Sequence, residues 1–218
     1  TKINSKALKA EALRLGFSAC GIAPAEPIDQ AHQNALKMWL DANRQAGMTY
    51  MANHFDKRCD PALLVEGTRC VVSVALNYYP ATRIPDEEYQ FAWYAYGKDY
   101  HDLMREKLAA LFRFIQESDV PELNDACSVT PRPYRNVIGP GVPARVDRKE
   151  HPADHSPCRF HFLLRRAFSE CGSDTYDRPQ PNRCGRCNRC LQACPTKSFR
   201  DAIQPECTPL PFIPHHRE

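Results

Sequence analysis

Apolar positions in the first 127 residues recur with the spacing of helices and strands, so this part of the chain is predicted to be a folded domain. A first helix is expected to start at a Ser5 cap and to end at Gly16. Its apolar face is made by Leu8, Ala12 and Leu15. The short apolar segment 17–23 that follows is predicted to be a strand.

Three further elements complete this domain. A second helix presents Leu36, Trp39 and Leu40 and is expected to end at Gly47. Residues 69–77 are a continuous apolar run, which is typical of a strand covered on both faces. Asp99 precedes a long helix whose apolar stripe is Leu108, Leu111, Phe112 and Ile115. Strands that alternate with helices predict an α/β (α+β) domain over residues 1–127.

The pattern is lost in two later stretches, 128–174 and 200–218. Neither shows a sustained period of 2 or 3.6, both are rich in proline, and charged residues are scattered without an apolar face. Such sequence cannot bury enough apolar area to offset the entropy of ordering it. We therefore expect both stretches to be irregular and not to pack as a core.

Between them, at 175–199, lies a dense cysteine motif. Its sequence is Cys184-Gly-Arg-Cys187-Asn-Arg-Cys190-Leu-Gln-Ala-Cys194-Pro195, which has the C-x2-C-x2-C-x3-C-P spacing of bacterial iron–sulfur sites. Structural zinc is the competing interpretation, because C-x2-C pairs also bind zinc. Zinc usually takes two separated pairs or adds histidine, so the spacing favours a [4Fe–4S] cluster in a ferredoxin-like segment.

Composition and charge narrow the class of protein. The net charge of +3 over 218 residues gives no global argument for nucleic-acid binding. No signal peptide and no apolar run of membrane-spanning length is recognised. Of the eleven cysteines, the seven outside the motif form no regular framework, which favours a reducing compartment and hence a cytoplasmic location.

Several motifs in this order resemble the epoxyqueuosine reductase family. They are Trp39-Leu40 with 47–51, Arg58 with Asp60-Pro61, the segment Tyr94-Ala-Tyr-Gly-Lys-Asp-Tyr-His101, and the cysteine run. The resemblance covers roughly 5–125 and 175–198. It implies a monomeric enzyme that takes electrons from an external donor. It also implies that cobalamin and two [4Fe–4S] clusters are used to reduce an epoxide on the tRNA anticodon region to an alkene in the last step of queuosine synthesis.

The resemblance also implies site residues. Arg58, Asn77, Tyr100 and His101 match family positions at the cobalamin pocket, and Cys184, Cys187, Cys190 and Cys194 are expected cluster ligands. Asn77 ends a buried strand, a natural place for ligand contact in α/β sheets. The aromatic residues of 91–96 could stack on a base or on the corrin, although core packing accounts for at least two of them. Arg183, Arg186 and Arg189 could contact tRNA phosphate or offset cluster charge.

The chain departs from the family in the irregular stretches. The family motifs D-S/T-A-P-V-x-E, A-G-L-G-W-x-G-K-N and F-L-G-E are absent as written, but shifted reading frames of 128–144 and 144–166 can spell them. We therefore expect frame damage and truncation. The in-register positions of the family's proposed proton donor are Ser128, Val129 and Thr130, so no catalytic acid is assigned, and Asp125 reads as a solvated loop residue. A second cysteine run is missing, and Cys207 is a poor substitute.

Two alternatives to an epoxyqueuosine reductase stay open. One is a ferredoxin-like electron-transfer module without a substrate of its own, although a simple carrier needs little of the long domain ahead of the cysteines. The other is a non-functional product of a damaged gene.

Overall fold

The computed structural model describes residues 2–118, 162–178 and 192, and these fall into two units. Of the described residues, those up to 26 and those from 60 to 178 belong to the first unit, and 27–59 and 192 belong to the second. The two units are treated separately below.

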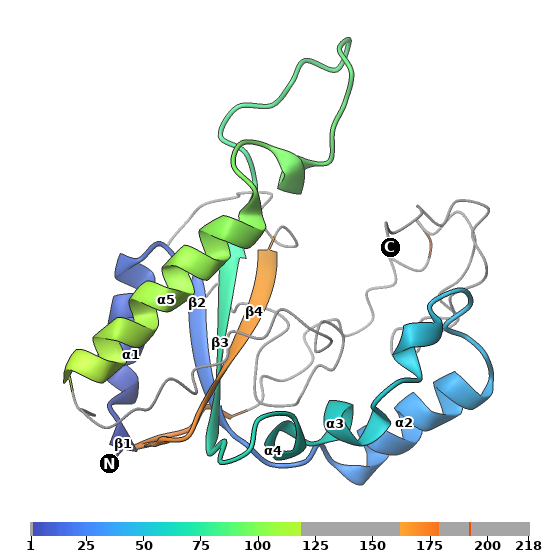
Figure 1. The fold of residues 1–218 in the computed structure, drawn as a ribbon. Coiled ribbons are helices and arrows are strands. Elements are labelled where there is room, and N and C mark those ends of the chain that lie inside the picture. The colour runs from blue at the N-terminus through green and yellow to red at the C-terminus, as the bar shows by residue number, and fades with distance from the viewer. Residues whose placement is uncertain (1, 119–161, 179–191, 193–218) are drawn as a thin grey trace. The chain divides into compact units, whose positions relative to one another are not determined.

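The first unit is built on a three-stranded antiparallel sheet of order β2-β3-β4 (Figure 1). The strands are β2 (Ala19–Pro24), β3 (Cys70–Asn77) and β4 (Phe162–Ser169). In the central register Val72 of β3 lies between Ile22 of β2 and Ala167 of β4. A parallel pair, β1 (Lys2–Ile3) with β5 (Gly172–Ser173), lies beside this sheet.

Two helices, α1 (Ser5–Arg14) and α5 (Tyr100–Ser118), pack against each other and cover one face of the sheet (Figure 1). Because strand side chains alternate between faces, the even-numbered residues of β3 point to the helices and form the core with them. The most buried members of that core are Leu8, Ala12, Ile22, Cys70, Val72, Val74, Met104, Leu108, Leu111 and Ala167. The predicted apolar stripes of both helices and the two-sided burial of the 69–77 run are confirmed.

The end of α1 shows how the two helices are joined. Gly16 adopts φ +88°, a left-handed conformation that favours glycine, and turns the chain out of the helix. Lys107 of α5 donates a hydrogen bond from Nζ to the Leu15 carbonyl and places a cation at the negative end of α1. The prediction that Gly16 ends this helix is confirmed.

The second unit contains α2 (Gln30–Asp41), a 3₁₀ turn η1 (Thr49–Met51) and α3 (Phe55–Cys59). Asp29 caps α2 by accepting from the backbone N–H of His32 at 2.9 Å. In the first unit a short helix, α4 (Pro61–Leu64), precedes β3, and a 3₁₀ turn, η2 (Trp93–Ala95), precedes α5.

Four expectations need correction. The cap of α1 is Asn4, whose side chain accepts from Ala7 N, and Ser5 is the buried first residue of the helix. The second helix ends at Asp41 and not at Gly47. The fold is mixed α/β, but the sheet is antiparallel, so the argument that placed Asn77 at the ligand-binding edge of a parallel sheet does not apply.

The fourth correction concerns 128–174. Residues 162–174 are not irregular, because 162–169 form β4 and 172–173 form β5. The cross-strand hydrogen bonds to β3 order this segment although its sequence lacks an alternating pattern. The rest of that stretch, the tail 200–218 and almost all of the predicted ferredoxin-like segment 175–199 lie outside the described residues.

Candidate functional site: the aromatic end of the sheet

Aromatic side chains gather where β3 ends and α5 begins. This aromatic cluster consists of Tyr78, Tyr79, Trp93, Tyr94, Tyr100 and His101. Edge-to-face contacts join Tyr78 to Tyr94 (ring centroids 6.5 Å apart) and Tyr94 to Tyr100 (6.0 Å). The Tyr79 and Trp93 rings meet edge to face at 5.1 Å, and Tyr100 stacks on His101 at 4.0 Å. The cluster therefore connects the loop 78–99 to the first turn of α5.

Asp99 fixes the orientation of His101 at the start of α5. Its Oδ1 accepts from the His101 backbone N–H at 2.8 Å and lies 2.9 Å from the His101 Nδ1. The hydrogen bond from that backbone N–H, followed by the contact with the imidazole, holds the pKa of Asp99 below its usual value. A carboxylate bound to one ring nitrogen sets the tautomer and direction of an imidazole, as in sites where histidine transfers protons or binds ligands.

Asn77 is the exposed last residue of β3. Its Oδ1 accepts from the Tyr79 backbone N–H at 2.9 Å and forms a turn that leads into the aromatic cluster. Three of the residues predicted to bind cofactor, Asn77, Tyr100 and His101, thus lie at the same end of the first unit.

On the face of the sheet opposite the helices, β2 and β3 carry small residues. Gly21 pairs with Ser73, and Ala19 pairs with Ala75. The Ser73 side chain is 3% exposed, and its hydroxyl has no hydrogen-bond partner in the part of the chain that the structure describes. Ser73 and Ala75 lie on the same face of β3 as Asn77, the last residue of the strand before the aromatic cluster. A buried hydroxyl without a partner costs free energy.

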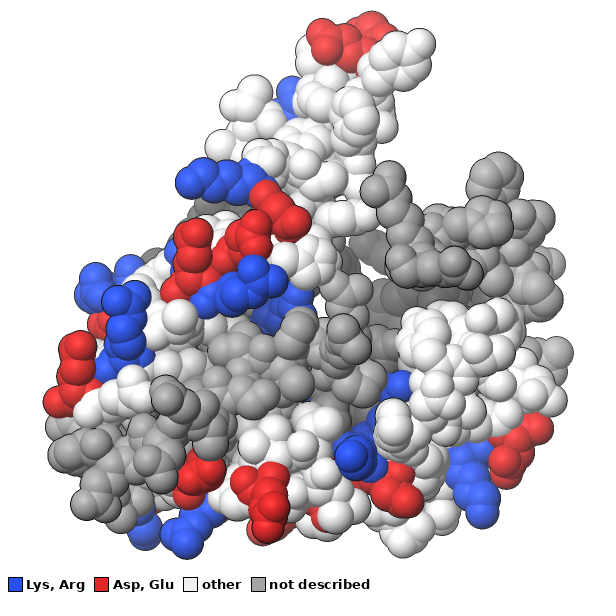
Figure 2. Space-filling model, viewed as in Figure 1, with Lys and Arg blue, Asp and Glu red and all other residues white. Residues whose placement is uncertain are grey.

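The loop 78–99 projects from this end of the sheet (Figure 1) and encloses an open hollow of about 420 Å³. Phe91 and Tyr96 are among its lining residues. Tyr89 is 91% exposed, and the neighbouring Asp86, Glu87 and Glu88 are also exposed. Figure 2 shows acidic side chains at the tip of this loop and a mixture of Lys, Arg, Asp and Glu elsewhere on the visible face.

Arg58 lies in the second unit and is 2% exposed. Its guanidinium donates to the backbone carbonyls of Asn53 (2.9 Å) and Tyr50 (2.8 Å). These bonds tie α3 to the turn before it, which is a structural role that the sequence did not reveal. The assignment of Arg58 to cofactor binding stays a prediction.

The four cysteines of the C-x2-C-x2-C-x3-C run lie outside the described residues. Cys20, Cys59, Cys70 and Cys171 are free thiols. Burial raises the pKa of Cys20 and of Cys70 to about 12, so both thiols stay protonated at neutral pH. No group of three or more potential metal ligands occurs among residues 2–118, 162–178 and 192.

Sequence reasoning missed two parts of the site. Tyr78 and Tyr79 follow directly after the buried strand, and aromatic residues at that point could have been taken as a signal. The Ser73 hydroxyl, which has no partner among the described residues, could not be found this way, because a serine within an apolar strand usually bonds to backbone or faces solvent.

The fold is that of a mixed α/β protein with an aromatic cluster at one end of its sheet. A family model described as "Epoxyqueuosine reductase QueG, DUF1730" matches residues 58–128. Epoxyqueuosine reductases from Cellulophaga algicola and Leadbetterella byssophila are 36% and 37% identical to the chain over 93% and 92% of its length. These matches confirm the predicted resemblance to the epoxyqueuosine reductases.

Solved structures agree at the level of the fold. A crystal structure of epoxyqueuosine reductase with an epoxyqueuosine-modified tRNA-Tyr stem loop has a TM-score of 0.65 at 22% identity over 88% of this chain. A structure of epoxyqueuosine reductase from Streptococcus thermophilus also has a TM-score of 0.65, at 19% identity over 93% of this chain.

The chain is shorter than the proteins that it matches. It spans 64% and 65% of the two relatives and 52% and 54% of the two structures. In the described part of the chain, no helix is both long and apolar enough to cross a membrane.

Proposed function

We propose that the chain is an epoxyqueuosine reductase that converts epoxyqueuosine to queuosine in tRNA in the cytoplasm. The observation that carries this proposal is the 36% identity to a named epoxyqueuosine reductase over 210 residues. It is supported by the epoxyqueuosine-modified stem loop bound to the structural neighbour.

The reaction fixes what the protein must supply. Reduction of the epoxide to an alkene consumes two electrons and two protons, breaks both C–O bonds and releases water. An external electron donor provides the electrons, and a positioned acid has to protonate the departing oxygen. No residue is assigned as that acid.

Cobalamin is the proposed cofactor of the first unit, and when bound it supplies two-electron reducing power. The chemistry of the aromatic end fits a large planar ring. The aromatic cluster offers flat apolar surfaces against which such a ring could stack. Asn77, Tyr100 and His101 would orient the ring from the end of β3 and the start of α5.

The cysteine run is the proposed ligand set for a [4Fe–4S] cluster. Its support is the chemistry of the donor set, four thiolates at ferredoxin spacing closed by Cys194-Pro195. The two clusters that the family uses require further ligands, and these are not assigned.

Frame damage stays a proposal for 128–166. One observation in β4 favours it. Of residues 162–166, which would be out of frame, Leu164 is exposed and the others are partly buried, whereas the in-frame residues Ala167, Phe168 and Ser169 are all buried. A damaged gene product without activity is therefore the second candidate.

The loading of cofactors separates these candidates. After anaerobic reconstitution with iron, sulfide and cobalamin, an epoxyqueuosine reductase should retain both iron and corrin through gel filtration. A ferredoxin-like module should retain iron alone. Chain that retains neither, or that is insoluble, would contradict the proposed function.

A further inference from the structure

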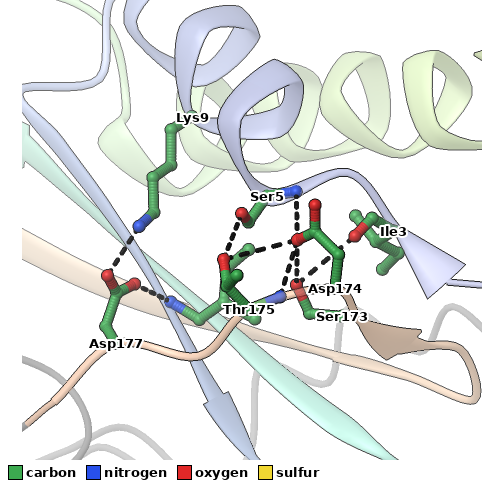
Figure 3. A network of polar contacts seen from close by, with 8 residues as sticks. Ile3, Ser5, Lys9, Ser173, Asp174, Thr175 and Asp177 are labelled. Atoms are coloured by element: carbon green, nitrogen blue, oxygen red, sulfur yellow. Dashed lines mark hydrogen bonds and ion pairs between the residues drawn. The ribbon is translucent and has the colours of Figure 1, made fainter.

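Residues 172–177 form a strap that joins the N-terminus of the chain to the outer edge of β2 (Figure 3). The strap begins with β5, which pairs with β1 in parallel and holds Gly172 beside Lys2. Residues about 170 positions apart in the sequence are thereby held side by side. All the contacts of the strap that are described below lie within the first unit.

Asp174 of the strap binds the first turn of α1. Its Oδ1 accepts from the Ser5 backbone N–H at 2.9 Å, and its own backbone N–H donates to the Ile3 carbonyl at 3.0 Å. Thr175 adds a hydrogen bond between its hydroxyl and that of Ser5. The start of α1 is thus capped twice, by Asn4 from the preceding residue and by Asp174 from the strap.

Asp177, the last residue of the strap, binds the edge of β2. Its Oδ2 accepts from the Ile22 backbone N–H, and its own N–H donates to the Ile22 carbonyl, both at 2.8 Å. The other carboxylate oxygen forms an ion pair with Lys9 of α1 at 2.6 Å. Asp177 therefore offers Ile22 one acceptor and one donor, which is what a residue of a neighbouring strand would offer.

The strand that Asp177 binds is an edge strand. Among the described strands β2 has one neighbour, β3, so the backbone groups of Ile22 point away from the sheet and toward the strap. Edge strands are commonly protected from pairing by charged side chains or by proline. Residues 19–24 include no charged residue, and Pro24 lacks an N–H at the end of the strand and not in its middle. Asp177 therefore protects the middle of this edge.

The edge of β2 is self-complementary. In an antiparallel pair of two β2 strands centred on Ile22, the Ile22 N–H of each copy donates to the Ile22 carbonyl of the other. These are the two backbone groups that Asp177 occupies. The opened edge thus fits a second copy of this chain, and the second copy can bind once Asp177 has left Ile22.

We propose that the strap opens and closes as one unit, and that in its closed state it prevents the edge of β2 from pairing with a second copy of the chain. The strap is held mainly by polar contacts, whereas β3 is buried from Cys70 to Leu76. Segments with few buried apolar contacts open at a lower free energy than the core. The inference does not rest on the proposed function, because no cofactor or substrate takes part in it.

Residue-resolved hydrogen exchange on the full chain tests whether the strap opens as one unit. The backbone amides of Ser5, Ile22 and Asp174 report on the strap, and those of β3 report on the core. Asp177→Ala removes the acceptor for Ile22 and the ion pair with Lys9. Exchange should accelerate about ten-fold, the loss of one charge-assisted bond, also at Ser5 and Asp174, whose amides donate to other acceptors. Exchange along β3 should not change.

Sedimentation velocity over a range of concentrations tests whether the strap prevents pairing. A dimer needs two opened chains, so a ten-fold larger open population should raise the association constant of the Asp177→Ala chain about a hundred-fold. Ala23→Lys in that chain places a charge on β2 and should restore the monomer. Asp102→Ala removes an exposed carboxylate from α5 with the same change in net charge. This control should alter neither exchange nor association.

Two results would overturn the proposal. One is exchange at Ser5 and Asp174 that is unchanged in the Asp177→Ala chain, or that rises only in step with the amides of β3. The other is an Asp177→Ala chain that associates no more tightly than the unmodified chain, or whose dimer persists with Ala23→Lys. Lys9→Met keeps both bonds to Ile22 and is the milder variant, so it should give the same pattern with smaller changes.

Discussion

At the scale of single residues, Gly16 is favoured both by its positive φ and by the closeness of Lys107. A Cβ added at Gly16 would lie 3.1 Å from Lys107 Nζ, and φ is +88°. Gly97 also has a positive φ, +76°, but nothing lies within 4 Å of the added Cβ. We predict that Gly16→Ala lowers the free energy of unfolding by more than about 1 kcal/mol and costs more than Gly97→Ala, which carries the backbone strain alone. Urea denaturation of the two variants measures the difference, and equal costs would show that Lys107 is not constrained by the glycine.

Asp174 gives a prediction about pH. The backbone N–H of Ser5, followed by its hydroxyl, lowers the pKa of this carboxyl below its ordinary value of about 4. A lowered pKa in the folded state stabilises the protein above the unfolded pKa, and that stability is lost as pH falls through the folded pKa. Asp174→Asn should therefore flatten the fall in denaturation midpoint below about pH 4. Asp102→Asn, at an exposed position on α5, is the control, and an identical acid limb in both variants would contradict the assignment.

At the scale of elements, the difference in burial along β4 allows a test of its register with β3. Phe168 is 3% exposed and Leu164 is 50% exposed. Phe168→Ala should cost about 3 kcal/mol of unfolding free energy, whereas Leu164→Ala should cost well under 1 kcal/mol. Denaturant titration of both variants measures this contrast. Similar costs would mean that β4 does not pair with β3 in the register Val71 to Phe168.

The aromatic cluster at the end of β3 and the start of α5 allows a test of where cobalamin binds. Tyr100→Leu keeps an apolar side chain but removes the ring that contacts Tyr94 and His101. We expect this change to weaken cobalamin binding about ten-fold, the effect of losing one aromatic contact in a site. Tyr89 is exposed in the loop 78–99, and Tyr89→Leu should leave the affinity for cobalamin unchanged. Titration followed by corrin absorbance measures both, and equal effects would place the corrin elsewhere.

The elements also show what could be predicted from the sequence. Strand 70–77 and helix 100–118 were found because their apolar residues form an unbroken run and a regular stripe. Strand 162–169 was missed because its order comes from hydrogen bonds to β3 and not from a pattern of its own. For the same reason the contacts of Asp174 and Asp177 with α1 and β2 were not predicted, since they join residues more than 150 positions apart.

At the scale of the whole molecule, the chain contains two parts of different character. One is a patterned α/β unit with an aromatic cluster at one end of its sheet, and the other is the cysteine run 184–194. In the sequence, the stretch 128–161 lies ahead of the cysteine run, and the stretch 200–218 follows it. Neither stretch matches a family motif as written. The nucleotide sequence tests the frame proposal: restoring the frame should return D-S/T-A-P-V-x-E and A-G-L-G-W-x-G-K-N. If no frame can encode these motifs, the proposal of frame damage is wrong.

The most direct test of the proposed function is the mass of the modified nucleoside. Chain reconstituted with iron, sulfide and cobalamin is incubated anaerobically with a chemical reductant and a tRNA stem loop that carries epoxyqueuosine, and the digested nucleosides are analysed by mass spectrometry. The account predicts that epoxyqueuosine loses one oxygen atom and becomes queuosine, and that Cys187→Ala abolishes the conversion. Unchanged epoxyqueuosine in the presence of chain that has retained both iron and corrin would contradict it.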